Sequence, residues 1–405
     1  MKTCLYVPTK GFFNMTRLLF SLYGFAFFNK FLLLTPVYAI FMQENGLNDL
    51  QLSTMFILSA IGTIAAQAPI TFLTNKFGQR WSMILGQFLK AFAILLWLAM
   101  PNYIGFVIGM FLWGAQAGFR SVAFEGLVYD SVHEYGAAKE YSKILGRKST
   151  YESIGVALSA FGSLLMFMGY DWVTWASVVS ILFSMVCLLI VPYRAMRNKT
   201  ANSAKLSLRE TLHTGYKICK KTPCLMSIML LTLFVVNVPF LDDFLSPIAL
   251  QIGIQTEYVG LLSFALLGCA TVGQRFAYRF KKIPDLLLCS LIGVVGIGYM
   301  IFSAFYSVWW LWALGVAYML FYGIYTLLYA QFQHMIPTRY RSVVLSFYTT
   351  LVYVVYMAVC GIIGLGGSLG SWRYSIMIQG LLMIIVFFWA LTRLYKKCPL
   401  ADDTV

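Results

Sequence analysis

Apolar stretches recur along the chain from Thr16 almost to Leu394, with short polar segments between them. A bilayer core needs roughly 20 mostly apolar residues for each helical crossing. Backbone polar groups cannot stay unsatisfied in lipid, and these stretches are too long and uniformly apolar for barrel strands, so they predict helices. The chain is therefore expected to be an all-α membrane protein. Its predicted spans are residues 17–41, 50–73, 81–99, 103–127, 147–168, 172–193, 224–248, 257–279, 284–304, 307–330, 342–365 and 373–394.

The longest polar segment lies near the middle of the chain, and Asn, Lys, Ser and Thr crowd it between Arg197 and Glu210. It leaves six predicted spans on either side. The predicted organisation is a six-helix bundle at 1–195, a cytoplasmic inter-domain loop at 196–222 and a second six-helix bundle at 223–405.

A weak internal repeat supports two equivalent halves. The segment from Leu34 to Ser53 contains Thr35-Pro36, and the segment from Leu245 to Ser263 contains Ser246-Pro247 in the matching place. Six-helix halves repeated in tandem are typical of transporters whose substrates bind near the middle of the membrane. The sequence thus predicts two pseudo-symmetric bundles.

The charge pattern orients the chain. Only 11% of the residues are charged, against roughly 25% in a soluble domain. The net charge of +15 comes from basic residues that fall almost entirely on one side of the predicted helices, whereas the opposite loops carry acids such as Glu44 and Asp171. This positive-inside pattern predicts cytoplasmic termini. The basic face is expected to contact anionic lipid rather than nucleic acid.

The sequence shows no enzyme-like constellation. The three histidines, His133, His213 and His334, lie near inner helix ends, the eight cysteines form no CxxC pair, and no phosphate-binding GxxxxGK[ST] occurs. We therefore expect no enzymatic activity, metal or other cofactor, and no ATP-driven pumping. Energy for transport would come from an ion or solute gradient.

Three segments carry a family resemblance. Residues 71–80, between the second and third spans, resemble the Gly-x-Leu-Ala-Asp-Arg-x-Gly-Arg-Arg loop of the major facilitator superfamily, matching at Leu73, Gly78 and Arg80. Asn75 replaces the acidic residue of that loop and Thr71 its first glycine. The charge relay that this loop usually forms is therefore in question here.

The other two segments resemble one bacterial branch of the same superfamily. Residues 124–131 are similar to its Glu-Ala-Leu-Leu-Tyr-Asp-Ser signature, and residues 336–346 to its Ile-Pro-Ser-x-x-Arg-Ala-x-x-Leu-Ser segment. The resemblance implies the twelve-helix fold of the superfamily and secondary active transport by a protein of the bacterial inner membrane. We expect a monomer. A fold hosts many functions, so the resemblance does not identify the substrate.

Ionisable side chains inside a membrane span cost roughly 2.5–3.5 kcal/mol on insertion scales, so each is a functional hypothesis. The spans contain Lys30, Lys90, Arg120, Glu125, Glu152, Asp242, Asp243 and Arg275.

Lys30 and the two neighbouring aspartates, Asp242 and Asp243, fall at similar depths in the two halves when the prolines are aligned. The resemblance implies that both helices line the central path, so that Lys30 faces Asp242 or Asp243 across it. Pairing would keep both groups charged, and breaking the pair by substrate or proton would release the bundles. The alternative is that Lys30 snorkels outward and the acids lie at the outer rim.

Arg120 is the deepest charge in the fourth span and is our candidate for binding a carboxylate or phosphate, because a guanidinium stays charged and offers a bidentate fork. Charged and polar residues nearer the cytoplasm are interpreted as a structural gate network rather than as catalytic groups. The predicted gate comprises Asn75, Arg80, Glu125, Asp130, Arg147, Glu152, Arg275 and Arg341.

Tyrosines form a stripe in the tenth span. Tyr318, Tyr322, Tyr325 and Tyr329 follow spacings of four, three and four, which puts four phenols on one helix face. Tyr353 belongs to a similar stripe in the next span, and Gln67 and Asn237 are weaker candidates. These side chains are expected to line a substrate cavity, the alternative being helix packing with interfacial belts.

These observations favour a carrier of a small polar or anionic organic solute that works by alternating access, with proton-coupled uptake as the preferred direction. One alternative is export of a metabolite, siderophore or drug by proton antiport. The fifth span, however, lacks the proline of the Gly-x-x-x-Gly-Pro-x-x-Gly-Gly pattern of drug antiporters. Another is a non-transporting receptor or scaffold on the same fold, which would have no reason to retain charges at the middle of the membrane.

Overall fold

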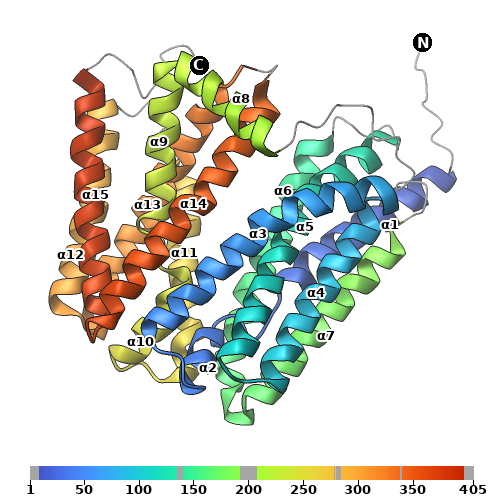
Figure 1. The fold of residues 1–405 in the computed structure, drawn as a ribbon, viewed down its shortest axis with the longest axis horizontal. Coiled ribbons are helices and arrows are strands. Elements are labelled where there is room, and N and C mark those ends of the chain that lie inside the picture. The colour runs from blue at the N-terminus through green and yellow to red at the C-terminus, as the bar shows by residue number, and fades with distance from the viewer. Residues whose placement is uncertain are drawn as a thin grey trace. The chain divides into compact units, whose positions relative to one another are not determined.

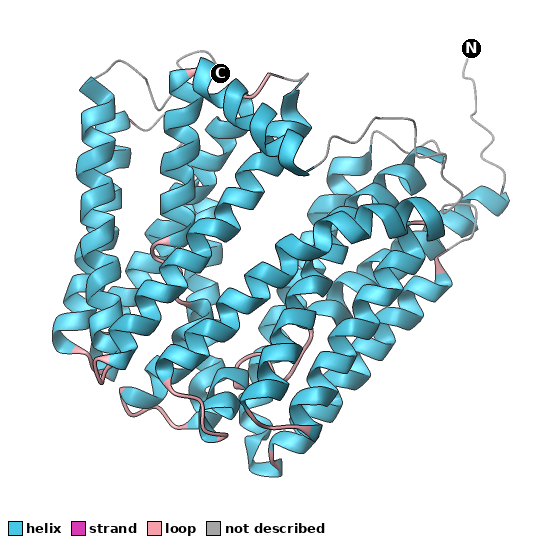
Figure 2. Ribbon diagram, in the orientation of Figure 1, coloured by secondary structure: helices cyan, strands magenta, loops and turns pink. Residues whose placement is uncertain are grey.

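The computed structural model describes residues 9–134, 140–191, 208–277, 279, 284–337 and 340–395. Within them every regular element is a helix (Figure 2). Ten segments of the described chain are long and apolar enough to cross a membrane. The remaining two predicted spans, 17–41 and 103–127, also fall on helices. The prediction of an all-α membrane protein is confirmed.

The chain folds into two compact units, and Figure 1 colours the chain from blue at the N-terminus to red at the C-terminus. The first comprises residues 1–45 and 61–203, and the second comprises residues 46–60 and 204–405. Residues 46–60, which the sequence division assigns to the first bundle, thus pack with the second. Their side chains show why: Phe56 packs edge-on against Phe244 with ring centroids 4.8 Å apart.

Helices of the first unit pack around a common core. Its α4 packs on α5 and α7, and α1 packs on α6 and α7. Gly78 alone separates α3 from α4 and has φ 85°, a conformation that favours glycine, which explains the glycine of the sequence motif. The elements are α1 Thr9–Lys30, α2 Tyr38–Glu44, α3 Asp49–Phe77, α4 Gln79–Ala99, α5 Tyr103–Glu134, α6 Tyr141–Ser159, η2 Ala160–Met168 and α7 Tyr170–Ile190.

The second unit repeats this scheme, with α12 packed on α13 and α15, and α11 packed on α13. The predicted inter-domain loop contains one further helix, α8, which lies against α9 and α14 (Figure 1). The elements are α8 Leu208–Lys221, α9 Pro223–Asn237, η4 Asp242–Phe244, α10 Leu245–Gln251, η5 Thr256–Tyr258, α11 Val259–Ala277, α12 Asp285–Phe305, η7 Val308–Trp310, α13 Leu311–Met335, α14 Arg341–Ser368 and α15 Trp372–Tyr395.

The first membrane span of each unit is interrupted, although the sequence predicts one continuous helix at 17–41 and another at 224–248. The first stops at Lys30 and resumes at Tyr38, and the second stops at Asn237 and resumes at Asp242. Pro36 lies in the first break and Pro239 in the second. Proline cannot donate the helical hydrogen bond and clashes with the preceding turn, which favours a break at these positions.

Side chains from other helices of the same unit satisfy the freed backbone groups, as the membrane interior requires. In the first unit, the Leu34 N–H donates to the Ser177 Oγ at 2.9 Å. In the second unit, the Gln379 amide donates to the Val238 and Phe240 carbonyls at 2.8 and 3.1 Å. Ser177 and Gln379 both come from the last helix of their unit, so the two breaks are held in equivalent ways.

Candidate functional site

Asp242 is an exposed carboxylate at the point where the chain resumes after the second break. Its Oδ1 accepts a hydrogen bond from the Tyr318 hydroxyl at 3.0 Å, and its Oδ2 accepts one from the Tyr322 hydroxyl at 3.1 Å. Both phenols come from α13, where a spacing of four residues places side chains on one face. The carboxylate is therefore held by two neutral donors.

Asp243 turns towards a different helix. Its Oδ2 accepts a hydrogen bond from the Tyr356 hydroxyl of α14 at 2.5 Å. The Tyr356 ring also packs edge-on against Phe240, with centroids 5.8 Å apart. Two adjacent carboxylates are thus tied to two neighbouring helices, and a change of charge at either one acts directly on α13 or α14.

The tyrosine stripe divides into two parts. Tyr318 and Tyr322 bind Asp242, whereas the Tyr325 ring stacks on Tyr329 with centroids 5.6 Å apart. Tyr329 in turn packs against Tyr348, with centroids 5.8 Å apart. Tyr318 and Tyr322 therefore hold the Asp242 carboxylate, whereas Tyr325 and Tyr329 pack towards α14.

The other predicted lining residues are Tyr353, Gln67 and Asn237. Tyr353 is half-buried one turn before Tyr356 on α14, and Gln67 is half-buried in α3. Asn237 is buried, and its amide donates to the Leu233 carbonyl of the same helix at 2.9 Å. This contact gives Asn237 a structural role at the end of α9.

In the first unit, Glu152 is shared by two cations. Its Oε1 lies 3.4 Å from an Arg120 guanidinium nitrogen, and its Oε2 lies 3.1 Å from the Lys148 ammonium. Arg120, predicted as an anion-binding residue, and Glu152, predicted as part of the gate, are thus neighbours. Among the described ion pairs, Glu152 is thus the shared partner of Arg120 and Lys148.

Sequence reasoning flagged Lys90 as costly in a span but assigned it no role. The structure buries Lys90, with its ammonium donating to the Asn29 carbonyl at 2.8 Å and to the Asn29 Oδ1 at 3.2 Å. The ammonium also lies 5.0 Å from the centroid of the Trp113 ring, a favourable cation–π position. A cation beside the last carbonyls of α1 stabilises that helix end.

The Asn29 side chain is the centre of a buried polar network. Besides Lys90, the amides of Gln87 and Gln116 donate to its Oδ1 at 3.1 and 3.4 Å. Ser184 donates to the Gln87 Oε1 at 3.1 Å. Lys90 also lies within electrostatic reach of Lys30 and Arg120.

Lys30 is the last residue of α1, directly before the first break. Its Cβ lies 3.2 Å from where a side chain on Gly155 would begin, so glycine at that position of α6 leaves the space that Lys30 needs. Lys30 therefore ends α1 with its Cβ towards α6, directly after Asn29, which binds Lys90 of α4.

The predicted gate is seen only in part. The Arg80 guanidinium donates to the Leu189 carbonyl at 2.5 Å, and the Arg341 guanidinium donates to Gln333 at 3.0 Å. Arg147 and Arg275 are exposed. The side chains of Asn75, Glu125 and Asp130 lie outside the described part of the structure.

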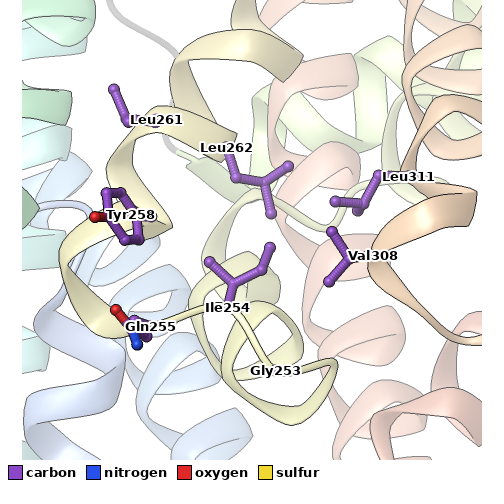
Figure 3. Close-up of a pocket in the computed structure, with 8 residues that line it drawn as sticks. All are labelled: Gly253, Ile254, Gln255, Tyr258, Leu261, Leu262, Val308 and Leu311. Carbon is purple, nitrogen blue, oxygen red and sulfur yellow. The ribbon is translucent and has the colours of Figure 1, made fainter.

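An apolar hollow of about 590 Å³ lies at one end of the second unit, between the η5 region and the start of α13. Figure 3 shows Tyr258 and Gln255 as its polar members among aliphatic side chains such as Leu262 and Val308. None of the predicted site residues lines it. Among the described residues, no three metal-ligating side chains come together.

The long apolar helices define an integral membrane protein, and its similarity to known proteins identifies it as a transporter rather than an enzyme. Residues 19–359 match the Major Facilitator Superfamily, and the chain belongs to that family. No relative was found among curated proteins.

Solved transporter structures share this fold. The nucleoside transporter NupG aligns with a TM-score of 0.71 and 9% identity, over 94% of this chain and 98% of that one. A bacterial homologue of the human lysosomal transporter Spinster, inward-facing and occupied, gives 0.67 and 15%, over 97% and 99%. The inward-open xylose transporter XylE from E. coli gives 0.66 and 14%, over 93% and 95%. These similarities establish the fold and leave the substrate open.

Proposed function

We propose that this protein is a secondary active transporter that takes up a small anionic, hydroxylated organic solute together with protons. Its main support is the contrast between the units. The first carries Lys30, Lys90 and Arg120 in its helices, and the second carries Asp242 bound by phenols.

The anionic part of the solute is proposed to bind at the first unit. Arg120 is 30% exposed, so its guanidinium can reach a solute, and it shares its carboxylate partner with Lys148. A solute carboxylate or phosphate would supply the missing negative charge. Such charge-assisted hydrogen bonds are stronger and shorter than those between neutral groups.

Proton coupling is proposed at Asp242. A carboxylate in a membrane span that is held by neutral phenols can accept a proton and keep these partners. Hydrogen bonds to Tyr318 and Tyr322 would pass the change in charge to α13. A D-xylose–proton symporter among the structural neighbours, at a TM-score of 0.65 and 14% identity, is consistent with such coupling on this fold.

The experiment is a ligand panel followed by uptake. Purified protein is heated with hydroxy acids, sugar phosphates, neutral sugars and nucleosides, because a ligand that binds the folded state raises the unfolding midpoint. Compounds that stabilise the protein are then tested in proteoliposomes with an imposed pH gradient. Stabilisation by neutral compounds alone would refute the anionic substrate.

The direction of transport needs its own comparison. Uptake coupled to protons requires accumulation when the outside is acidic and none when the gradient is reversed. Accumulation only with the reversed gradient would instead establish the antiport alternative. Binding without any flux in either gradient would favour the receptor alternative.

We further propose that transport requires an electrostatic interaction between Lys30 and either Asp242 or Asp243. The test is a set of charge exchanges, Lys30→Asp combined in turn with Asp242→Lys and Asp243→Lys. Recovery of uptake in one double variant, relative to both of its single variants, is the expected result. Equal loss in single and double variants would remove this coupling from the mechanism.

A further inference from the structure

A second feature lies on the face of the second unit formed by α11, α12 and α13. It is an apolar groove with a cavity volume of about 440 Å³, lined entirely by apolar residues. Helices α11 and α12 form its walls, and α13 forms its floor. The residues used below are Val272 and Phe276 of α11, Leu287 of α12, and Leu320 and Gly323 of α13.

Close approach of two backbones gives the groove its depth. A side chain on Gly273 would collide with the Met319 carbonyl, and one on Gly323 would begin 3.2 Å from the Gly273 carbonyl. Glycines at both positions therefore let α11 and α13 cross with their backbones in contact. Because neither glycine has a side chain, these two positions leave the groove unfilled.

The groove opens on the apolar surface of the unit. Val272, Phe276 and Leu287 are 42%, 46% and 49% exposed. They lie on helices long and apolar enough to cross a membrane, where the surroundings of an exposed apolar side chain are lipid acyl chains. The groove therefore faces lipid rather than water.

A positive charge marks one end of the groove. The Arg279 guanidinium lies 5.3 Å from the centroid of the Phe276 ring, and Arg279 is exposed. Among the described residues, no carboxylate forms an ion pair with it. This end lies between the last turn of α11 and the first turn of α12, which the charge pattern of the chain assigns to the cytoplasmic side.

We propose that the groove is a binding site for an anionic phospholipid. One acyl chain lies in the groove between Val272 and Leu287, and the headgroup phosphate is held by the Arg279 guanidinium. A guanidinium offers paired donors to a phosphate, and anionic lipids are abundant in cytoplasmic leaflets. A choline headgroup adds a positive charge next to Arg279, so a zwitterionic lipid binds more weakly.

The test compares two lipids with identical acyl chains, phosphatidylglycerol and phosphatidylcholine, on the purified full-length protein in detergent. Native mass spectrometry counts the bound lipid, and thermal unfolding reports stabilisation. Phosphatidylglycerol is expected to bind more tightly and to raise the unfolding midpoint further. Equal binding of both lipids would overturn the proposal.

Three variants locate the site. Arg279→Gln is expected to remove at least half of the difference between the two lipids, and Val272→Trp, at a 42% exposed position, to reduce the binding of both by filling the groove. Lys217→Gln removes an exposed positive charge from α8 and is expected to retain the wild-type difference. An unchanged difference in Arg279→Gln, or unchanged binding in Val272→Trp, would refute the site.

A further measurement distinguishes binding of free phosphate from binding of a lipid headgroup. Inorganic phosphate alone is expected to give the same change in the unfolding midpoint in the wild-type protein and in Arg279→Gln. A rise that matches the one caused by phosphatidylglycerol and is lost in Arg279→Gln would overturn the acyl-chain part of the proposal. None of these measurements uses a solute or a pH gradient. Their outcome is therefore independent of whether the proposed transport function holds.

Discussion

The Tyr318 hydroxyl donates a 3.0 Å hydrogen bond to Asp242, joining the middle of α13 to the break in the first span of the second unit. The Asp242 carboxylate is exposed, whereas Tyr318 is only 2% exposed. One end of the bond is thus accessible to solutes and ions while the other is fixed in the helix packing. This arrangement suits a group whose charge changes during transport.

Neutralising Asp242 should separate proton-driven accumulation from solute exchange. In Asp242→Asn we expect uptake driven by a pH gradient to fall by roughly tenfold or more, equivalent to at least 1.4 kcal/mol. Exchange of labelled for unlabelled solute should persist, because it needs no net proton movement. Proteoliposome uptake with and without the gradient measures both, and an Asp242→Asn protein that still accumulates solute would exclude Asp242 as the coupling group.

Removing the hydroxyl of Tyr318 should have a larger effect on stability and uptake than removing that of Tyr322. A hydrogen bond to a charged group contributes roughly 1.5–3 kcal/mol, and Tyr318 is more deeply buried than Tyr322. Tyr318→Phe is therefore expected to reduce the free energy of unfolding and the uptake rate more than Tyr322→Phe does.

The control for these two variants is Tyr374→Phe, at a tyrosine that is 41% exposed. It should behave like the wild-type protein in thermal unfolding and in uptake. Similar losses in all three variants would show that phenol hydroxyls matter only through general stability.

The stripe of tyrosines also illustrates how far the sequence leads. Spacing alone correctly places Tyr318 and Tyr322 on one face of a helix, but the sequence predicts Lys30, not these phenols, as the partner of the carboxylates. Spacing does not reveal that the same stripe divides, because Tyr325 and Tyr329 turn to Tyr348 on α14. That division depends on the packing of two helices distant from Asp242 in the sequence.

Hydropathy predicts where helices lie but not where they are interrupted. The segments around Leu34 and Val238 are apolar enough to read as helix, and the interruptions are stabilised by local backbone turns together with a side chain from a distant helix, Ser177 or Gln379. Lys90 is a similar case. The sequence shows that a lysine inside a membrane span is energetically costly. No sequence pattern predicts that the principal acceptor of Lys90 is the backbone carbonyl of Asn29.

Glu152 should compete with the solute for Arg120. Its carboxylate lies 3.4 Å from the guanidinium, so Glu152→Gln leaves Arg120 with a stronger attraction for an anion. We expect the dissociation constant of an anionic solute to decrease in Glu152→Gln and to increase roughly tenfold or more in Arg120→Gln, equivalent to 1.4 kcal/mol.

Binding isotherms of the purified variants provide this measurement, and Glu140→Gln is the matched control, because Glu140 forms an exposed ion pair with Lys143. If Glu152→Gln only lowers the unfolding midpoint and leaves affinity unchanged, the Arg120–Glu152 pair is structural. The anion would then have to bind elsewhere in the first unit.

Substitutions of Lys90 and Asn29 should have non-additive effects on the free energy of unfolding. Both side chains are buried, and the Lys90 ammonium has two acceptors on Asn29. Lys90→Met leaves the Asn29 carbonyl without its donor, a loss of roughly 1–3 kcal/mol for a buried group. In a double-mutant cycle with Asn29→Ala we expect a coupling of about 0.5–3 kcal/mol, the usual range for residues in contact.

Equilibrium unfolding in mixed micelles gives the four free energies, and Lys143→Met, at an exposed lysine, replaces Lys90→Met in a control cycle that should show no coupling. Additive effects of Lys90→Met and Asn29→Ala would mean that the Asn29 side chain contributes nothing to holding Lys90, and that the backbone carbonyl at the end of α1, which Asn29→Ala retains, is the acceptor that matters.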